Sequence, residues 1–580
     1  MPEVSLRKVV TRKLNDFCCT ACHSPILSFS SIRSDTNTSI FPKYHATRQP
    51  TCQAVANTNA NDPSLSYKVT PQVEFVGKSA PETTGKQHYA VSLTAGSLPD
   101  TKARAPIDVV VAMDISGSMS SNNKLNLCKK TCEILVNELG NDDQFGLSLF
   151  STNVRVAFPL QKMNATNKGR ALAVIAAIRT EGQTNLSGGL TSAIGELQGS
   201  TSKNEVRSIM LLTDGHANQG VTEPRAVIDL TKACLASTPN ISVNVFGYGC
   251  DHNAELLRKI SEASVTKGSY YFIESNDNVS SAFGDCLGGL MSVAAQNITI
   301  TISGENIKVL YDTVVTKSTG TYEINLGDMF AEESKDVVVE VENLGDGDQH
   351  EITAIVSYID IFSMRPVKAE PESGVILRPK GTEVAPTNSH VALQIMRITV
   401  AKAMAEANLL GQRGDMAGGR QIITQQLAAI ASLSASFKPT EADQLVINSF
   451  LSDLNEAIAT MNTSVQEYAY RGSKNMCKKM QGHAMQRSNE ESEETENLYR
   501  GSAKSAMACK MKMNSMSPAI LHAIHGSVSR RPPPPNGPPP PRSLAPPPPS
   551  GKPISAPQTS SGIPPSPLKA TPPPVSVGLG

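Results

Sequence analysis

The hydrophobic pattern between residues 106 and 292 alternates between two kinds of segment. Continuous apolar runs, such as IDVVVAMD and VRSIMLLTD, are typical of parallel strands that are buried on both faces. Segments such as KLNLCKKTCEILVNEL carry apolar residues at three- and four-residue spacing, which predicts amphipathic helices. The adjoining runs QFGLSLFS and VRVAF predict a hairpin. The predicted order is βαββααβαβαβα, a doubly wound α/β domain over 105–292 whose ligands lie beyond the carboxyl ends of the strands.

A different pattern flanks this domain on both sides. Residues 63–104 and 293–385 alternate apolar and polar positions, as in HYAVSLTA and NITITIS, which predicts antiparallel strands. Gly345-Asp346 is interpreted as a hairpin turn, because no calcium-loop ligand pattern follows it. Neither β segment has enough strands to close a core alone. We therefore expect the two segments to form one β-sandwich into which the α/β domain is inserted.

The rest of the chain divides by composition. Residues 386–487 carry helical spacing, as in VALQIMRITVAKAMAEANLL, and predict a helical module. Residues 488–527 are interpreted as a linker with a short helix, and 1–62 as a poorly ordered segment. Residues 528–580 are rich in proline, lack acidic residues and cannot bury a core. They predict a disordered tail with polyproline II character.

Composition narrows the classes of function. The 580 residues allow about three or four domains. Lys+Arg and Asp+Glu are each 53, which excludes a generally basic nucleic-acid binder. No apolar run is long enough to span a membrane, and no apolar stretch follows the basic N-terminal residues, so a secretory signal is not expected. Eleven scattered cysteines suggest reduced thiols and a cytoplasmic location.

Polar clusters fall at the predicted ends and loops of the α/β domain. Asp114, Ser116 and Ser118 follow the first strand, Thr184 lies between two helices, and Asp214 ends a second central strand. We expect their side chains to converge, since neighbouring parallel strands end at one edge of a sheet. Two carboxylates and three hydroxyls suit a hard ion such as Mg²⁺ or Mn²⁺. With only two carboxylates, the ion would keep a position for a carboxylate from a partner.

The motifs DISGSM, EGQTNLSGGL and LLTDG resemble the metal-ion-dependent adhesion site of von Willebrand factor type A domains. The resemblance covers about 106–292 and includes all five site positions. It implies a six-stranded Rossmann-like domain that binds protein partners through Mg²⁺ or Mn²⁺. A narrower resemblance is to plant and protist proteins of this family, in which a β-sandwich and a helical module accompany the domain. That module also occurs in intein-like, Hedgehog-type proteins, and some plant members carry a RING finger and are ubiquitin ligases.

The N-terminal segment contains candidate ligands for zinc and for haem. It offers six candidate ligands: Cys18, Cys19, Cys22, His23, His45 and Cys52. A RING finger needs paired ligands for two zinc ions, and the downstream CxxC pair is missing, so a complete finger is not expected. Four of these ligands could hold one zinc ion, although free cysteines are the preferred interpretation. The CxxCH spacing also fits c-type haem attachment, which a reducing compartment disfavours.

Other enzyme motifs are weak or absent. Gly247-Tyr248-Gly249 follows a strand, but His252 stands where a dinucleotide site needs its third glycine. His216 lies near the candidate metal site, yet there is no nucleophile elbow and no Walker A motif. The sequence thus predicts a non-enzymatic adaptor.

Its partners would be a carboxylate-bearing protein at the metal and an SH3, WW or profilin-type protein at the proline-rich tail. The alternative is the substrate-binding part of a ubiquitin-ligase-like protein whose RING is degraded or missing.

Overall fold

The structure is a computed structural model. It describes residues 65–71, 87–97, 104–201, 203–215, 217–274, 276–311, 314–341, 349–377, 388–488 and 499–515. The predictions for 1–62, for the Gly345-Asp346 turn and for 528–580 concern residues outside this described part.

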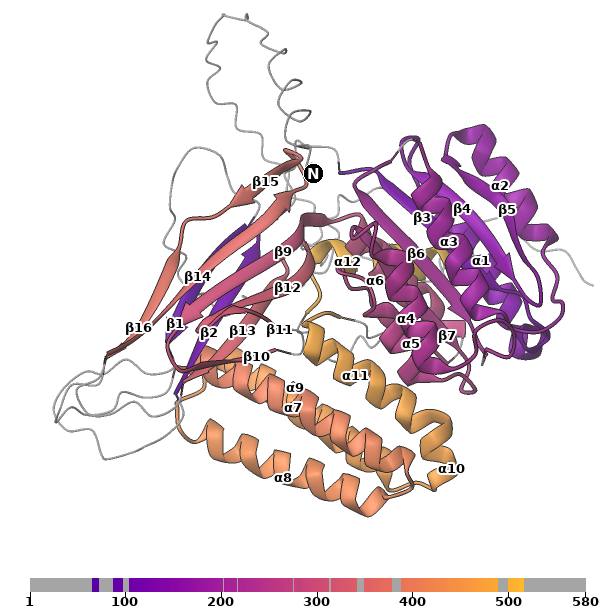
Figure 1. The fold of residues 1–580 in the computed structure, drawn as a ribbon. Helices are drawn as coiled ribbons and strands as arrows, with labels where there is room; N and C mark the ends of the chain where they lie inside the picture. The colour runs from indigo at the N-terminus through magenta and orange to yellow at the C-terminus, as the bar shows by residue number, and fades with distance from the viewer. Residues whose placement is uncertain are drawn as a thin grey trace, which may run out of the picture. The chain divides into compact units, whose positions relative to one another are not determined.

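The α/β region folds around one six-stranded sheet (Figure 1). Its strands are β3 (Ile107–Asp114), β4 (Gln144–Phe150), β5 (Val154–Lys162), β6 (Val206–Thr213), β7 (Ile241–Tyr248) and β8 (Tyr270–Ile273). They lie in the order β5-β4-β3-β6-β7-β8, and all are parallel except β5, which pairs antiparallel with β4. The doubly wound α/β fold and the β4–β5 hairpin predicted from the sequence are therefore present.

Helices cover both faces of this sheet. They are α1 (Lys124–Glu138), α2 (Ala165–Ala177), α3 (Leu186–Gly199), α4 (Pro224–Leu235), α5 (Ala254–Ser261) and α6 (Asn276–Leu290). Val109 and Val111 of β3 pack in one core with residues of α1, α2 and α6. Val110 and Ala112 pack in a second core with residues of α3, α4 and α5. Because both faces of β3 are covered, the strand is apolar from Val109 to Met113, which is the run seen in the sequence.

The flanking β segments form two further sheets. One holds β1 (Leu65–Pro71), β2 (Gln87–Ala95), β13 (Ser334–Val341) and β10 (Ile307–Leu310), in that order. The other holds β11 (Val314–Ser318), β12 (Thr321–Phe330), β9 (Val293–Gly304), β14 (Gln349–Asp360) and β15 (Arg365–Lys368), with β16 (Glu372–Leu377) also paired to β14. Strand β2 pairs along its length with β13, so segments from either side of the α/β region share one sheet. Residues of both sheets share one apolar core, as a sandwich requires.

The C-terminal part of the described chain is helical, as predicted. It comprises α7 (Ser389–Gln412), α8 (Met416–Ser434), α9 (Glu441–Met461), α10 (Val465–Glu467), a short π-helical turn (Tyr468–Gly472), α11 (Ser473–Met485) and α12 (Ser502–Ser515). Helices α7, α8, α9 and α11 contribute to one apolar core of their own. The resemblance of this region to the module of Hedgehog-type proteins stays a prediction.

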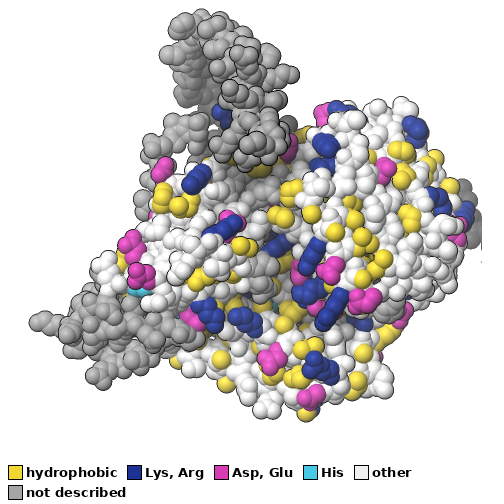
Figure 2. Space-filling model, in the orientation of Figure 1, with side chains coloured by type: hydrophobic (Ala, Val, Ile, Leu, Met, Phe, Trp, Pro, Cys, Tyr) yellow, Lys and Arg dark blue, Asp and Glu magenta, His cyan; other side chains and the backbone are white. Residues whose placement is uncertain are grey.

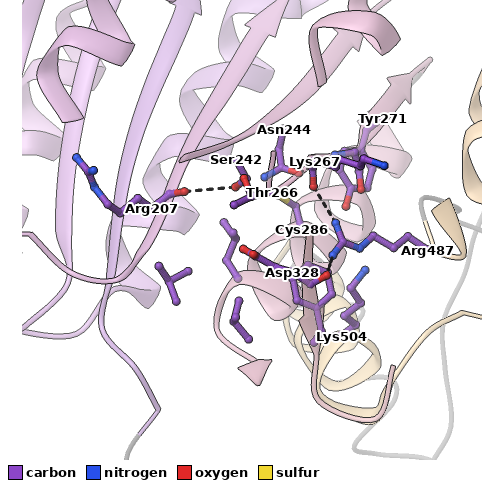
Figure 3. Close-up of a pocket in the computed structure, with 15 residues that line it drawn as sticks. Arg207, Ser242, Asn244, Thr266, Lys267, Tyr271, Cys286, Asp328, Arg487 and Lys504 are labelled. Atoms are coloured by element: carbon purple, nitrogen blue, oxygen red, sulfur yellow. Dashed lines mark hydrogen bonds between the residues drawn. The ribbon is translucent and has the colours of Figure 1, made fainter. Parts of the chain in front are cut away.

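Arg487 joins this helical part to both other regions. Its side chain is buried and donates hydrogen bonds to the backbone oxygen of Lys267, at 2.8 Å, and to that of Asp328 (Figure 3). It also pairs with the Glu333 carboxylate, Nε to Oε1 at 3.0 Å. Lys267 follows α5, whereas Asp328 and Glu333 belong to the sandwich, so one guanidinium links three regions of the chain.

Charged side chains of both signs are mixed on the described surface, as the formal net charge of zero leads us to expect. On the face drawn in Figure 2, Lys and Arg side chains lie among Asp and Glu side chains rather than in a patch of one sign. Among the described residues, no helix is both long and apolar enough to cross a membrane.

Candidate functional site

The two aspartates of the candidate site come from neighbouring strands. Strand β3 pairs parallel with β6, with Met113 opposite Leu212. Asp114 ends β3, and Asp214 follows β6 directly, so both emerge at the same edge of the sheet. Both are almost fully buried. The placement expected from the sequence is therefore correct for this pair.

The loop after β3 is held by backbone hydrogen bonds. Ile115 N–H donates to the Phe150 oxygen at 2.9 Å, and Gly117 N–H to the Gly182 oxygen at 3.1 Å. Ser116 N–H donates to Asp114 Oδ1 at 2.8 Å. These bonds turn the chain so that both loop hydroxyls face the aspartates.

The two serine hydroxyls lie beside each other. Ser116 Oγ is 3.1 Å from Ser118 Oγ, which donates to Asp214 Oδ1 at 2.8 Å. Ser116 is buried, whereas Ser118 is exposed at the mouth of the site. The loop thus presents a row of oxygen atoms from the sheet edge toward solvent.

Thr184 reaches the same place from the loop before α3. Its N–H donates to Asn218 Oδ1 at 2.7 Å, and its oxygen accepts from Asn218 N–H at 3.1 Å. A methyl group added to Gly215 would lie 3.5 Å from Thr184 Oγ1 and 3.7 Å from Ser118 Oγ. The two hydroxyls therefore flank Gly215, and the structure brings all five predicted site residues together.

The donors fit a hard divalent ion. An octahedral Mg²⁺ site has oxygens about 2.0–2.1 Å from the ion, so adjacent oxygens lie about 2.9 Å apart. The spacings of 3.1 Å between the Ser116 and Ser118 hydroxyls and of 2.8 Å from Ser118 to Asp214 are close to that edge length. Within the described residues, no three His, Cys, Asp or Glu side chains gather as in a softer or more acidic metal cage. A site here would depend on hydroxyls as much as on carboxylates.

The carboxyl of Asp114 is electrostatically unusual. Burial raises its pKa to about 6, and the nearby Asp214 adds to the rise. Hydrogen bonds from Ser116 and Thr213 oppose it, including one from Thr213 Oγ1 to Asp114 Oδ2 at 2.6 Å. Two buried carboxylates at one edge need a cation beside them to stay charged together.

Lys124 supplies such a cation, which the sequence pattern did not predict. Its Nζ lies 2.5 Å from Asp214 Oδ2, and its side chain is buried. Lys124 is the first residue of α1. A lysine at the positive end of a helix dipole is unfavourable, and that misplaced charge was the signal in the sequence.

Among the described residues, Gly247 and His252 of the weak dinucleotide motif pack against each other. A methyl group at Gly247 would lie 2.6 Å from Nε2 of His252, which is buried and bonds the Tyr270 hydroxyl at 2.6 Å. Gly247, in strand β7, thus makes room for the ring of His252, which stands where a dinucleotide site needs its third glycine. His216 and the N-terminal Cys and His residues lie outside the described residues.

Comparisons with known proteins identify the domain that carries these residues. The family model of the von Willebrand factor type A domain matches residues 108–284. A solved von Willebrand factor type A structure from Catenulispora acidiphila aligns with a TM-score of 0.52 at 16% identity, covering 70% of this chain and 91% of that one. Residues 108–284 therefore form a von Willebrand factor type A domain.

Two curated relatives come from Arabidopsis thaliana. The E3 ubiquitin-protein ligase WAV3 is 24% identical over 352 residues, which are 57% of this chain and 44% of that protein. The E3 ubiquitin-protein ligase WAVH1 is 22% identical over 441 residues, which are 69% of this chain and 58% of that protein. The chain thus spans about half the length of the curated relatives it matches. The expectation that the chain is not an enzyme is contradicted, because these similar proteins are named as ligases.

Proposed function

We propose that the von Willebrand factor type A domain binds Mg²⁺ or Mn²⁺ and, through it, a carboxylate of a protein partner. The metal ligands would be Asp114, Ser116, Ser118, Thr184 and Asp214. The observation that carries the proposal is the convergence of oxygen donors from three separate segments at one end of the sheet. Domains of this family bind protein ligands, which supports the assignment.

Each part of the site has a distinct task in this proposal. Asp114 and Asp214 supply the negative charge, and Thr213 and Ser116 hold Asp114 in place by hydrogen bonds. Ser118 is exposed, so the side of the site next to it is open to a partner. The bound ion would supply a coordination position with residual positive charge, because the ligands include only two carboxylates.

The test is calorimetric titration of the full chain with MgCl₂ and MnCl₂. Asp114→Asn should weaken binding by about tenfold or more, because a carboxylate is the stronger ligand for a hard ion. Asp142→Asn is the matched control, since the Asp142 side chain is exposed and pairs with a surface lysine, Lys162, at 3.2 Å. Equal metal binding by the wild type and Asp114→Asn would contradict the proposal.

The partner chemistry needs a second measurement. An array of short peptides that each carry one Asp or Glu should retain the labelled chain in Mg²⁺ and release it in EDTA. The same peptides with Asn or Gln should not retain it. Retention that is equal in Mg²⁺ and EDTA would show that the partner does not bind through the ion.

We also propose a second function, in which the bound partner is a substrate for ubiquitination. Its support is the similarity to the two plant ligases, which extends over more than half of this chain. The test combines zinc analysis of the full chain with a ubiquitin-transfer assay that contains the activating enzyme, a panel of conjugating enzymes and ATP. Conjugates that disappear in Cys19→Ser and Cys22→Ser would support it. The proposal would be contradicted if the chain contained no zinc and formed no ubiquitin conjugates with any conjugating enzyme of the panel.

The proline-rich tail is proposed to bind an SH3, WW or profilin-type partner. Pro564 and Pro567 are one turn apart in a polyproline II helix, and Lys569 follows them with the spacing of an SH3 ligand. Titration of the full chain with a panel of such domains should show binding that Pro567→Ala and Lys569→Ala weaken. These residues lie outside the described part, so the proposal stands on the sequence alone.

We also propose that the protein is located in the cytoplasm. The seven cysteines among the described residues are all free. Free thiols in this number suit a reducing compartment.

A further inference from the structure

Lys124 occupies an unusual place for a charged residue. Its side chain is only 5% exposed, yet its Nζ is 2.5 Å from Asp214 Oδ2. A second carboxylate oxygen, Oδ2 of Asp251, lies 3.8 Å from the same nitrogen. The Asp251 side chain is 65% exposed, so the ammonium lies between a buried acceptor and a surface acceptor.

Helix α1 itself does not explain this lysine. It begins at Lys124, where the helix dipole is positive and disfavours a cation. Asn123 precedes it with a φ of 63° and makes no side-chain capping hydrogen bond. The lysine therefore occupies an unfavourable helix position, and its contacts are with the two aspartates outside the helix.

The aliphatic part of the Lys124 side chain packs against the backbone of a glycine. Gly249 has a φ of +70°, and a methyl group there would lie 2.9 Å from Cε of Lys124 and 3.2 Å from its Nζ. The Gly249 N–H donates to the Ile273 oxygen at 2.8 Å, which holds this turn against β8. The stem of Lys124 thus passes along backbone that carries no side chain.

We propose that Lys124 is a tethered cation that competes with the metal ion for Asp214. Binding of the ion requires the ammonium to leave Asp214 and pair with Asp251, so Lys124 sets how much divalent metal the site needs. The inference rests on the proposed metal site and adds the element that regulates it. It treats Asp251, which is not a ligand, as the residue that receives the displaced charge.

Electrostatics gives the direction of the effect. A divalent ion and an ammonium on one carboxylate repel each other, and a medium around them that is less polar than water strengthens the repulsion. The metal-competent state is the one in which Lys124 has moved, so apparent affinity falls in proportion to the population of that state. Because Asp251 already lies 3.8 Å away, a change of side-chain rotamer is the expected movement.

The experiment measures metal affinity directly, by calorimetric titration with MgCl₂. Lys124→Met keeps an unbranched apolar stem and removes the charge, and it should tighten Mg²⁺ binding about tenfold or more. Lys130→Met is the matched control on the same helix, because the Lys130 side chain is 56% exposed and pairs with Glu133. It should leave the affinity unchanged. Lys124→Gln serves as a second variant if the methionine variant is poorly folded.

Asp251 is tested in a double-mutant cycle. Asp251→Asn should weaken Mg²⁺ binding in the wild type, because the displaced ammonium loses its acceptor. The same substitution should have little effect in the Lys124→Met background, because no ammonium remains to be received. An equal effect in both backgrounds would show that Asp251 acts by some other route.

Thermal melting without metal gives an independent readout. Lys124→Met should lower the melting temperature in EDTA, because Asp214 loses its counter-ion, and MgCl₂ should restore more stability to the variant than to the wild type. If Lys124→Met binds Mg²⁺ with an affinity equal to or weaker than that of the wild type, the inference about Lys124 is wrong, although the metal site itself is supported. If neither the wild type nor any variant binds Mg²⁺ or Mn²⁺, the proposed metal site and the inference are both wrong.

Discussion

Replacing Arg487 with methionine should destabilise the whole assembly of sandwich, α/β domain and helical part. The guanidinium bonds the Lys267 oxygen at 2.8 Å (Figure 3). It also bonds Glu333 Oε1 at 3.0 Å and lies 4.3 Å from the centre of the Phe330 ring. Methionine keeps much of the volume but none of the donors. The Glu333 carboxylate would then stay buried without this partner.

The magnitude follows from burial. Removing one member of a buried ion pair costs about 3–5 kcal/mol, because the remaining charge stays out of water. Burial alone would raise the pKa of the Glu333 carboxyl, but Lys335 and Lys504, together with Arg487, outweigh it and lower the pKa. Some compensation therefore remains, and we expect a loss near the lower end, about 3 kcal/mol.

The assay is urea unfolding followed by far-ultraviolet circular dichroism, since the chain has no tryptophan. Arg155→Met is the control, because Arg155 and Glu181 form a pair whose side chains are 48% and 51% exposed. Such a surface pair is worth about 0–1 kcal/mol. If Arg487→Met loses no more stability than Arg155→Met, the buried guanidinium does not stabilise this junction as argued.

Three further predictions concern the sandwich and its contact with the helices. Tyr89→Phe removes the hydroxyl that donates to the His350 oxygen at 2.8 Å and should cost about 1–3 kcal/mol in urea unfolding. Leu93→Ala, at a fully buried position of strand β2, should cost about 2–5 kcal/mol, and exchange of β13 amides should then rise, because β2 and β13 share a sheet. Burial alone would lower the pKa of His390, but the neighbouring Asp336 outweighs this effect and raises the pKa. The ion pair between protonated His390 and Asp336 therefore stabilises the fold fully below about pH 6.5. That contribution should disappear as pH rises through the raised pKa, and the urea midpoint of His390→Gln should lack this dependence.

Local pattern was sufficient to predict the fold around the site. Strand β3 is covered by helices on both faces, and a strand with no solvent face carries a continuous apolar run, here from Val109 to Met113. Parallel strands end at one edge, so the polar residues after β3 and β6 were bound to meet there. Asp114, Ser116 and Asp214 could therefore be brought together from the sequence alone.

Pairing between distant side chains was decided only by the tertiary structure. Lys124 is 90 residues from Asp214, and Arg487 is 154 residues from Glu333. Neither pair leaves a periodic signal, because a charge that meets its partner across the fold has no fixed spacing in the chain. The sequence indicated where negative charge would gather, whereas only packing decided which cation would be buried beside it.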